Sequence, residues 1–185
     1  MDHFESIEMR PFAAASIGQI HRAVMTDGTK VVVKIIKSDF EASFKRDVQR
    51  MKRWIRMGLF FNPRLRKVGN PIGLLAHIED YTLRELNLLN EIDGRNQLIA
   101  QAEAIEHHFP MPKLKFPKVW EHLSNQHILV MEEITHPTLE DHLEAGTLTW
   151  PDMLDLFRIH GAFMFGIGTF HGDLHPGNAM MDGEG

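Results

Sequence analysis

The chain has 185 residues, 43% of them hydrophobic, and a formal net charge of −5. This length suffices for one domain, or most of one, with a buried core, and the negative charge excludes a general attraction to nucleic acid. Without Cys the chain has no disulfide or thiolate metal site, which fits a reducing compartment and predicts a cytoplasmic location. No apolar run approaches about 18 residues, and the first residues do not have the pattern of a signal peptide.

Residues 11–36 predict two strands joined by a hairpin. Ile20 to Met25 is compatible with a strand, and Thr26-Asp27-Gly28-Thr29 is a turn. Residues 31–36 are a run of β-branched side chains interrupted by one Lys, which predicts the second strand of the hairpin.

Two long helices are predicted next. The first has apolar residues at steps of three and four with a basic opposite face: Phe44, Val48, Met51, Ile55 and Leu59. Asn62-Pro63 and Gly69-Asn70-Pro71 break the chain. A second helical run covers about 72–106, with Gly94 as the candidate position for a kink or break. Its expected apolar contacts are Leu75, Ile78, Leu83, Leu86, Leu89 and Ile92.

The second half predicts strands, helices and a polar loop. Residues 118–123 and 127–134 are expected to form two strands. Thr138 begins a capping box that enters a short helix, and Thr149-Trp150-Pro151-Asp152 opens a longer helix that runs to Gly168. A short last strand is expected at about 179–181. This order is that of a kinase, in which a sheet-rich N-lobe precedes a helical C-lobe.

The polar loop reads His171-Gly172-Asp173-Leu174-His175-Pro176-Gly177-Asn178. An Asp and an Asn five residues apart suit phosphoryl transfer, because the carboxylate can orient a substrate hydroxyl and the amide oxygen can hold nucleotide-bound Mg²⁺. An ordinary Gly/Pro turn is the alternative. The two His have the spacing of a zinc pair, but the Gly and Pro residues around them argue against the helix that such a pair needs.

A second motif lies in residues 11–20. A kinase phosphate loop reads G-x-G-x-x-G-x-V, and its positions are occupied here by Ala13, Ala15, Gly18 and Ile20. Alanine restricts how closely a backbone can approach phosphate, so this loop should hold a nucleotide differently from an ordinary kinase. A hairpin turn of small residues is the alternative.

Lys34 follows Ile20 by 14 residues, on the strand paired with the exit strand of this loop. A Lys at this place can reach nucleotide phosphates, although an exposed Lys at a strand edge is the alternative. A kinase Lys needs a helical Glu partner, and Glu85 and Glu91 are the candidates. On one continuous helix they would point about 120° apart and serve different partners. Otherwise each belongs to a solvated acidic face.

A basic segment spans residues 45–67, with Asp47 as its one acid. Its cations are Lys45, Arg46, Arg50, Lys52, Arg53, Arg56, Arg64, Arg66 and Lys67. One interpretation is a solvated helix face. The other is contact with an anionic membrane surface, because Trp54, Phe60 and Phe61 accompany the cations. A nucleic-acid partner is not predicted, since no recognition motif accompanies the charge.

Four segments occur in order: Ala-Ala-Ala-Ser-Ile-Gly-Gln-Ile-His-Arg-Ala, Val-Val-Val-Lys, Glu-Leu-Asn-Leu-Leu-Asn-Glu and His-Gly-Asp-Leu-His-Pro-Gly-Asn. Together they resemble the UbiB, or AarF, family of atypical kinase-like proteins, from about Phe4 to Met181. The resemblance implies an α+β, protein-kinase-like two-lobe fold. Residues 1–134 would form the N-lobe, with a helical insertion at about 38–78, and residues 135–185 a partial C-lobe with the catalytic loop.

The resemblance also implies an atypical kinase or ATPase that binds ATP or ADP with Mg²⁺ and supports ubiquinone or isoprenoid-lipid metabolism. Lys34, Asp173 and Asn178 would be catalytic, and Asn178 would bind Mg²⁺. Glu85 would pair with Lys34, and Glu91 would pair with a Lys of an N-terminal extension. The implied nucleotide-binding residues are Ala13, Ala14, Ala15, Ser16, Gly18, Lys34, Glu85, the gatekeeper Met131, and the hinge residues Glu132 and Ile134.

Two family motifs are not found in these 185 residues: an upstream Lys-x-Gly-Gln and a downstream Asp-Phe-Gly. The chain is therefore expected to be a fragment or a truncated reading frame that does not catalyse a reaction alone. Two alternatives stay open. One is a small-molecule phosphotransferase resembling aminoglycoside or choline kinases, which share the His-Gly-Asp loop. The other is a nucleotide- or lipid-binding scaffold without catalysis.

Overall fold

The structure is a computed structural model that describes residues 3–14, 18–62, 69–169, 172 and 174–182. The chain forms two compact units. The first, Met1–Ile92 with Val119–Met131, is called the N-terminal unit, and the second, Asp93–Lys118 with Glu132–Gly185, the C-terminal unit. The sequence placed a lobe boundary at residues 134 and 135, which assigned residues 93–118 to the N-lobe, whereas these residues group with the C-terminal unit.

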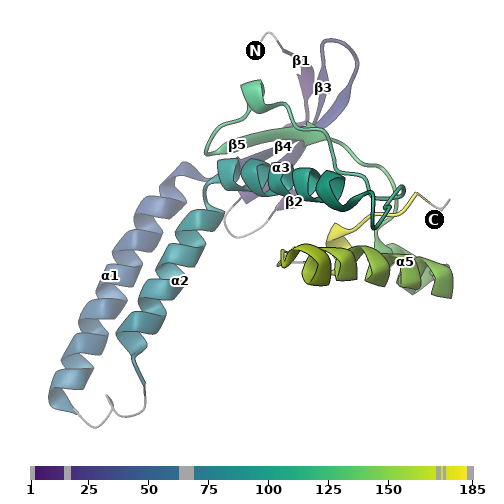
Figure 1. The fold of residues 1–185 in the computed structure, drawn as a ribbon. Coiled ribbons are helices and arrows are strands. Elements are labelled where there is room, and N and C mark those ends of the chain that lie inside the picture. The colour runs from purple at the N-terminus through teal and green to yellow at the C-terminus, as the bar shows by residue number, and fades with distance from the viewer. Residues whose placement is uncertain (1–2, 15–17, 63–68, 170–171, 173, 183–185) are drawn as a thin grey trace. The chain divides into compact units, whose positions relative to one another are not determined.

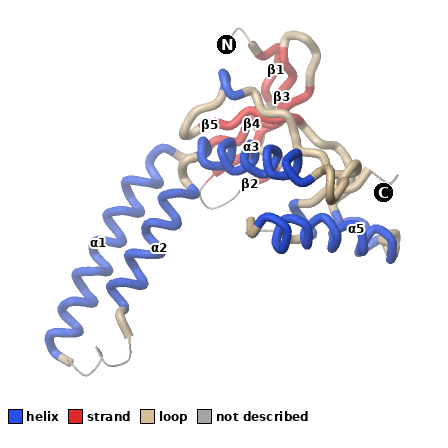
Figure 2. The backbone as a smooth tube through the Cα atoms, viewed as in Figure 1, coloured by secondary structure: helices blue, strands red, loops and turns tan. Residues whose placement is uncertain are grey.

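A single sheet dominates the N-terminal unit (Figure 2). Its strands are β1 (Phe4–Ile7), β3 (Gly18–Met25), β4 (Lys30–Ile36) and β5 (Ile128–Glu132) in that spatial order, with the short β2 (Ala13–Ala14) also paired to β3. The predicted hairpin is confirmed: β3 and β4 are antiparallel, and Gly28 in the connecting turn has a φ of 83° that suits glycine. The edge strand β1 was not predicted, because its mostly exposed residues show no apolar alternation.

The two faces of the sheet belong to two clusters of buried side chains, because successive residues of a strand point to opposite faces. Val31 and Val33 of β4 belong to one cluster with Ala23, Met25 and Val130. Ile36 belongs to the other with Leu86, Leu88, Ile92 and Leu129. Since Lys34 has the parity of Ile36 along β4, its side chain lies on the face of the second cluster.

Gly18 begins β3 at a close approach to the neighbouring strand. A Cβ at this position would lie 2.9 Å from the backbone carbonyl oxygen of Ile35, closer than such atoms can come. We therefore expect Gly18→Ala to destabilise the chain by about 1–3 kcal/mol in urea unfolding. Gly94→Ala is the control, because nothing lies within 4 Å of a Cβ there, in a helix interior, and it should stabilise by about 0.5–1 kcal/mol. Equal effects of the two changes would contradict this account.

Helices α1 (Ser38–Phe61) and α2 (Pro71–Glu85) lie side by side and antiparallel (Figure 1). Val48 and Leu59 of α1 and Leu75 of α2 are buried, and Lys52 forms an ion pair with Glu79 whose side chains are 12% and 16% exposed. The apolar face predicted for α1 is thus confirmed at Val48 and Leu59. It is wrong at Met51, which is 52% exposed. The inserted helices together span residues 38–85, beyond the predicted end at about 78.

The second predicted helix is two helices. α2 ends at Glu85 and α3 covers Leu88–Ile105. The Asn87 side chain accepts the backbone N–H of Leu89 (3.2 Å), as an N-cap does, and the Asn90 side chain donates to the carbonyl of Arg84 (2.8 Å). The break predicted at Gly94 is wrong, since Gly94 lies inside α3.

Two capping boxes begin α4 and α5 in the C-terminal unit; the first was predicted, and at the second only the helix start was predicted. Thr138 caps α4 (Leu139–Ala145) with Asp141, and Thr149 caps α5 (Trp150–Gly161) with Asp152. Hydrogen bonds from Thr138 lower the pKa of Asp141, and those from Thr149 lower the pKa of Asp152, because they favour the ionised carboxyl group. A π-helical turn, Ala162–Ile167, continues α5 and ends at Gly168, as expected.

Two predicted strands are wrong. Val119 makes only an isolated bridge to Met131, and Glu121–Leu123 form a 3₁₀ turn. Met180 likewise makes only an isolated bridge to Thr138. Both segments run beside a partner too briefly to form a ladder. Among the described residues, no helix combines the length and the apolar composition that crossing a bilayer requires.

Candidate functional site

Three strands bring the predicted phosphate loop into register with Lys34. Ala13 of β2 lies opposite Ile20 of β3, and Ile20 lies opposite Lys34 of β4. Directly opposed residues of antiparallel strands point to the same face of a sheet. The side chains of Ala13, Ile20 and Lys34 therefore share one face, on which α3 packs through Leu88 and Ile92.

Lys34 contacts Glu91. The Lys34 ammonium forms an ion pair with the Glu91 carboxylate, and the two side chains are 33% and 38% exposed. The predicted pairing with Glu85 is wrong: Glu85 is exposed at the end of α2, and it forms no ion pair within the described part of the chain. The physical reason is the break at Asn87, which starts a new helix and turns Glu91 toward β4. The role predicted for Glu91, pairing with a Lys of an N-terminal extension, stays a prediction, because such an extension is not among these 185 residues.

The exposure of the Lys34–Glu91 pair decides what it can do. An ion pair exposed to this degree contributes about 0–1 kcal/mol to stability, because water screens it. Its main effect is on position, since the carboxylate holds the end of a long and flexible side chain in one place. The ammonium stays accessible for a second anionic group.

The ends of the predicted phosphate loop are strands. Ala13 and Ala14 pair with Ile20 and Gln19, and the Phe12 N–H donates to the carbonyl of Ile20 (3.0 Å). Gly18 is buried at the start of β3. Ala15 and Ser16 lie outside the described residues. β2 and β3 thus flank the tip of the loop as an antiparallel pair.

The predicted gatekeeper and hinge lie where the chain leaves the N-terminal unit. Met131 packs against the cluster that contains Leu88 and Ile92. At Glu132 the backbone N–H donates to the carbonyl of Lys118 (2.8 Å), and the carboxylate accepts the Lys118 N–H (3.0 Å). Ile134 is half-buried. The chain passes between the units at 92/93, at 118/119 and at 131/132.

A 3₁₀ turn, Pro176–Asn178, holds the described part of the polar loop. The His175 ring nitrogen Nδ1 accepts the N–H of Gly177, and the Asn178 side-chain oxygen accepts the N–H of His175, both at 3.1 Å. A Cβ on Gly177 would lie 3.1 Å from a carboxylate oxygen of Glu140, so α4 approaches this turn closely. Asp173 lies outside the described residues.

Asn178 carries a side-chain oxygen that could hold Mg²⁺. The side chain is exposed, and its amide oxygen, which accepts the N–H of His175, is a donor of the kind that Mg²⁺ prefers. Within the described residues, no group of three or more His, Asp or Glu side chains could hold a metal ion.

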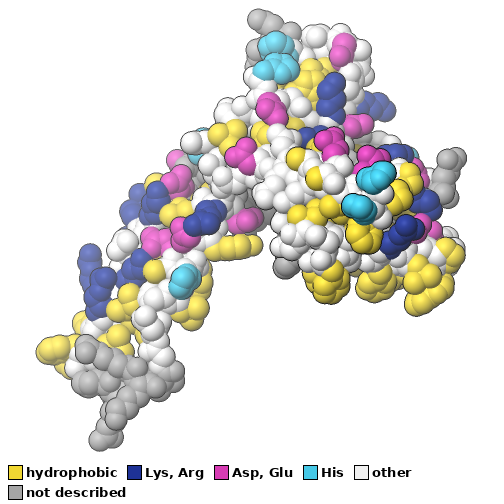
Figure 3. Space-filling view, in the orientation of Figure 1, with side chains coloured by type: hydrophobic (Ala, Val, Ile, Leu, Met, Phe, Trp, Pro, Cys, Tyr) yellow, Lys and Arg dark blue, Asp and Glu magenta, His cyan; other side chains and the backbone are white. Residues whose placement is uncertain are grey.

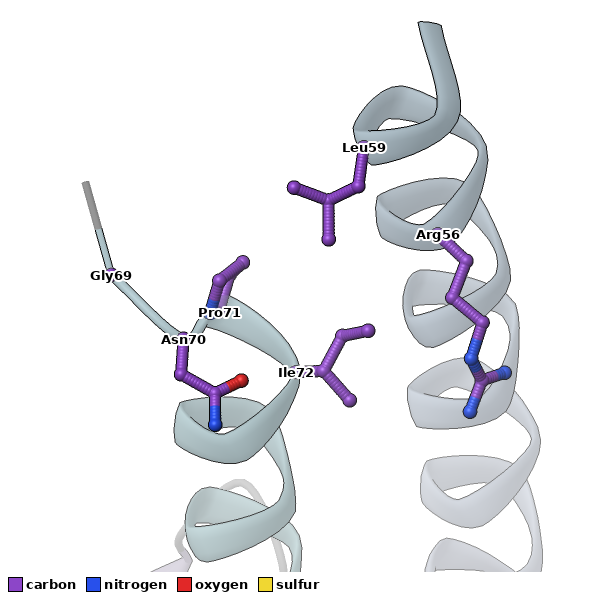
Figure 4. A pocket seen from close by; sticks show the side chains of 6 residues that line it. All are labelled: Arg56, Leu59, Gly69, Asn70, Pro71 and Ile72. Atoms are coloured by element: carbon purple, nitrogen blue, oxygen red, sulfur yellow. The ribbon is translucent and has the colours of Figure 1, made fainter. Parts of the chain in front are cut away.

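A cavity of about 380 Å³ lies at the end of the α1–α2 pair where α1 ends and α2 begins (Figure 4). It lies between the last turns of α1 and the first turn of α2. Its lining contains one cation and no acid: Arg56, Leu59, Gly69, Asn70, Pro71 and Ile72. None of the predicted nucleotide-binding residues contributes, so the nucleotide is not assigned to this cavity.

Comparison with known proteins matches all of this chain. A model of the ABC1 atypical kinase-like domain matches residues 1–185. Two proteins named "Probable protein kinase UbiB", from Cellvibrio japonicus and Sodalis glossinidius, are 28% and 30% identical, each over 98% of this chain and 32% of its own length. "Uncharacterized protein Rv0647c" from Mycobacterium tuberculosis is 30% identical over 98% of this chain and 37% of its own length. The chain thus spans about a third of the length of these relatives.

A solved structure shares the fold. The complex of Rv3197 with erythromycin, from Mycobacterium tuberculosis, superposes with a TM-score of 0.68 at 24% identity, over 98% of this chain and 44% of that one. The likeness confirms the predicted α+β, kinase-like fold.

Sequence reasoning missed Glu91 as the partner of Lys34. The signal that could have found it was the Asn87-x-x-Asn90 pattern, which favours a helix start four residues before Glu91.

Proposed function

Since the chain belongs to the ABC1 atypical kinase-like domain family, we propose that it binds a nucleotide with Mg²⁺ and takes part in phosphoryl transfer or ATP hydrolysis. Its similarity to UbiB proteins supports a role for this activity in ubiquinone or isoprenoid-lipid metabolism. The alternative of an aminoglycoside- or choline-kinase-like enzyme is not favoured, because the family match follows the whole chain and not only the His-Gly-Asp loop.

The observation that carries the proposal is the Lys34–Glu91 ion pair, on the sheet face that Ala13 and Ile20 share. Lys34 would contact the nucleotide phosphates as a point charge, and Glu91 would hold it in place. The backbone of residues 13–18 would border the phosphates. Because alanine replaces glycine at positions 13 and 15, this contact would be looser than in an ordinary kinase.

Asn178 and Asp173 would supply the rest of the chemistry. Bound Mg²⁺ would neutralise the charge that develops on the phosphates, and the Asn178 side-chain oxygen would bind it. The Asp173 carboxylate would orient the attacking hydroxyl or water and accept its proton. Met131 would border the adenine, and the backbone of Glu132 to Ile134 would meet its edge.

Removing the Lys34 ammonium should weaken nucleotide binding. A hydrogen bond to a charged group contributes about 1.5–3 kcal/mol, so Lys34→Met should raise the dissociation constant for Mg-ATP or Mg-ADP by roughly 10- to 150-fold. Thermal unfolding at increasing nucleotide concentration measures this, since ligand at one hundred times its Kd stabilises by about 2.7 kcal/mol. Glu91→Gln should cause a smaller loss of nucleotide affinity, because the Lys34 ammonium is still present and has lost only its ion-pair partner.

Lys30→Met is the matched control, because Lys30 stands on the same strand and face, four residues earlier and exposed. It should leave nucleotide binding unchanged. Nucleotide stabilisation of equal size in the parent chain and in Lys34→Met would refute the proposed role of Lys34. No stabilisation of the parent chain by any nucleotide would refute nucleotide binding by these residues.

A further inference from the structure

The edge strand of the sheet is interrupted just before the predicted phosphate loop. Ile7 of β1 lies opposite Ala23 of β3, whereas Ala13 of β2 lies opposite Ile20 of β3. Residues 8–12 of the edge strand therefore stand against only two residues of β3, and the excess bulges from the ladder. This segment, residues 8–12, is called here the edge bulge. Because it separates β2 from β1, the pairing of β1 does not by itself fix where the phosphate loop begins.

The two residues of β3 that face the edge bulge are His21 and Arg22, and each holds one end of it. At the first end, the N–H of Glu8 donates to the carbonyl of Arg22 (2.9 Å), and the His21 ring nitrogen Nδ1 donates to the carbonyl of Glu8 (2.8 Å). Nδ1 is the donor because a carbonyl oxygen can only accept. The His21 side chain is buried, and its Nε2 lies 3.3 Å from the Gln19 amide oxygen. The imidazole thus gives a backbone carbonyl a hydrogen-bond partner where the ladder breaks.

Arg22 holds the last residue of the edge bulge from the opposite face of β3, since adjacent residues of a strand point to opposite faces. Its guanidinium carbon lies 4.4 Å from the centre of the Phe12 ring, which is a cation–π contact. The Phe12 N–H also donates to the carbonyl of Ile20 (3.0 Å). Figure 3 shows hydrophobic, charged and His side chains mixed on the surface over β1 and β3. The contacts within the sheet, and not a surface patch, therefore set this segment apart.

We infer that His21 and Arg22 are positioning residues for the predicted phosphate loop, an inference that rests on the proposed nucleotide binding. β3 is an interior strand, paired with β1 and β2 on one side and β4 on the other, so it gives the edge bulge a fixed support. β2 is two residues long and joins the sheet through β3. Alanine at positions 13 and 15 restricts the backbone of the loop. The loop then adjusts less readily to a phosphate group, and its place is decided where the chain enters it.

His21→Leu removes the hydrogen-bond donor and keeps an apolar side chain of similar size. Amide hydrogen exchange of residues 8–14, measured without nucleotide, should become about 2- to 10-fold faster, the effect of one hydrogen bond. The dissociation constant for Mg-ATP or Mg-ADP should rise by about the same factor. His21→Asn places an amide N–H where Nδ1 stands, so it should restore most of both. Its smaller side chain leaves a void that lowers stability, so stability alone would not produce this order.

Phe12→Leu tests the other end of the edge bulge without changing a buried side chain, because Phe12 is 46% exposed. Loss of the ring should raise the dissociation constant about 2- to 5-fold, as expected for an exposed cation–π contact. Met25→Ala is the matched control. Met25 is buried on β3, on the same face as His21 and four residues farther from the bulge. Its truncation should lower the midpoint of thermal unfolding and leave both nucleotide affinity and the exchange of residues 8–14 unchanged.

Two results would overturn the inference by showing that affinity follows stability and not these contacts. They are an equal loss of affinity in Met25→Ala and no recovery in His21→Asn. Nucleotide binding by His21→Leu and Phe12→Leu that is as tight as in the parent chain would overturn this inference alone and leave the proposed function standing. No nucleotide binding by the parent chain would refute the proposed function, and this inference with it.

Discussion

Asp173→Asn is expected to reduce ATP hydrolysis or phosphoryl transfer by the protein by about 10²–10⁴-fold. The amide can still accept a hydrogen bond, but it cannot take the proton of the attacking hydroxyl. Nucleotide affinity should change little, because Lys34 and Asn178, not Asp173, are the proposed contacts to phosphate and metal. Turnover is measured by phosphate release under saturating Mg-ATP, and binding by nucleotide-dependent thermal unfolding of the same samples.

Asp182→Asn is the control for this prediction. Asp182 stands nine residues after Asp173 and forms an ion pair with Lys115 (3.1 Å), with a side chain 35% exposed. Removing its charge should leave turnover within about twofold, because an exposed ion pair contributes little. Unchanged turnover in Asp173→Asn would remove that residue from the mechanism. Nucleotide binding by the parent without any turnover would favour the non-catalytic scaffold instead.

Local chemistry made part of this fold predictable from the sequence. The hairpin of β3 and β4 follows from Asp27-Gly28 between two apolar runs, and both capping boxes follow from Thr and Asp three residues apart. In each case the residues that decide the structure are neighbours in the chain. The same is true of the pairing of Ile20 with Lys34, since the short turn after Met25 fixes the register of β3 and β4.

Longer-range features were not predictable in the same way. The apolar residues from 72 to 106 fit one continuous helical pattern, so periodicity concealed the break at Leu86 and Asn87. That break decides which Glu meets Lys34. Met51 and Ile78 were expected inside and are about half exposed, because each helix of a two-helix pair buries only a narrow stripe. Val119 has strand-like neighbours, but its partner strand ends too soon for a ladder.

Leu88→Ala is expected to give the largest loss of stability. Leu88 is fully buried in the cluster that joins α3 to β4 and β5 through Ile36, Ile92 and Leu129. Truncating a buried Leu costs about 2–5 kcal/mol, because it removes apolar burial and leaves a cavity. In a chain of this size this corresponds to a drop of about 5–15 °C in the midpoint of thermal unfolding. Urea unfolding followed by far-ultraviolet circular dichroism measures the free energy.

Leu89→Ala tests whether the loss is specific to burial. The change is chemically identical one residue later, but Leu89 is 37% exposed, so it should cost less than about 1 kcal/mol. Because α3 carries Glu91 three residues after Leu88, loosening this cluster should also weaken nucleotide stabilisation in Leu88→Ala and not in Leu89→Ala. If both variants lose equal stability, α3 does not pack through Leu88. If Leu88→Ala loses stability but binds nucleotide as the parent chain does, the cluster stabilises the fold without positioning the Lys34–Glu91 pair.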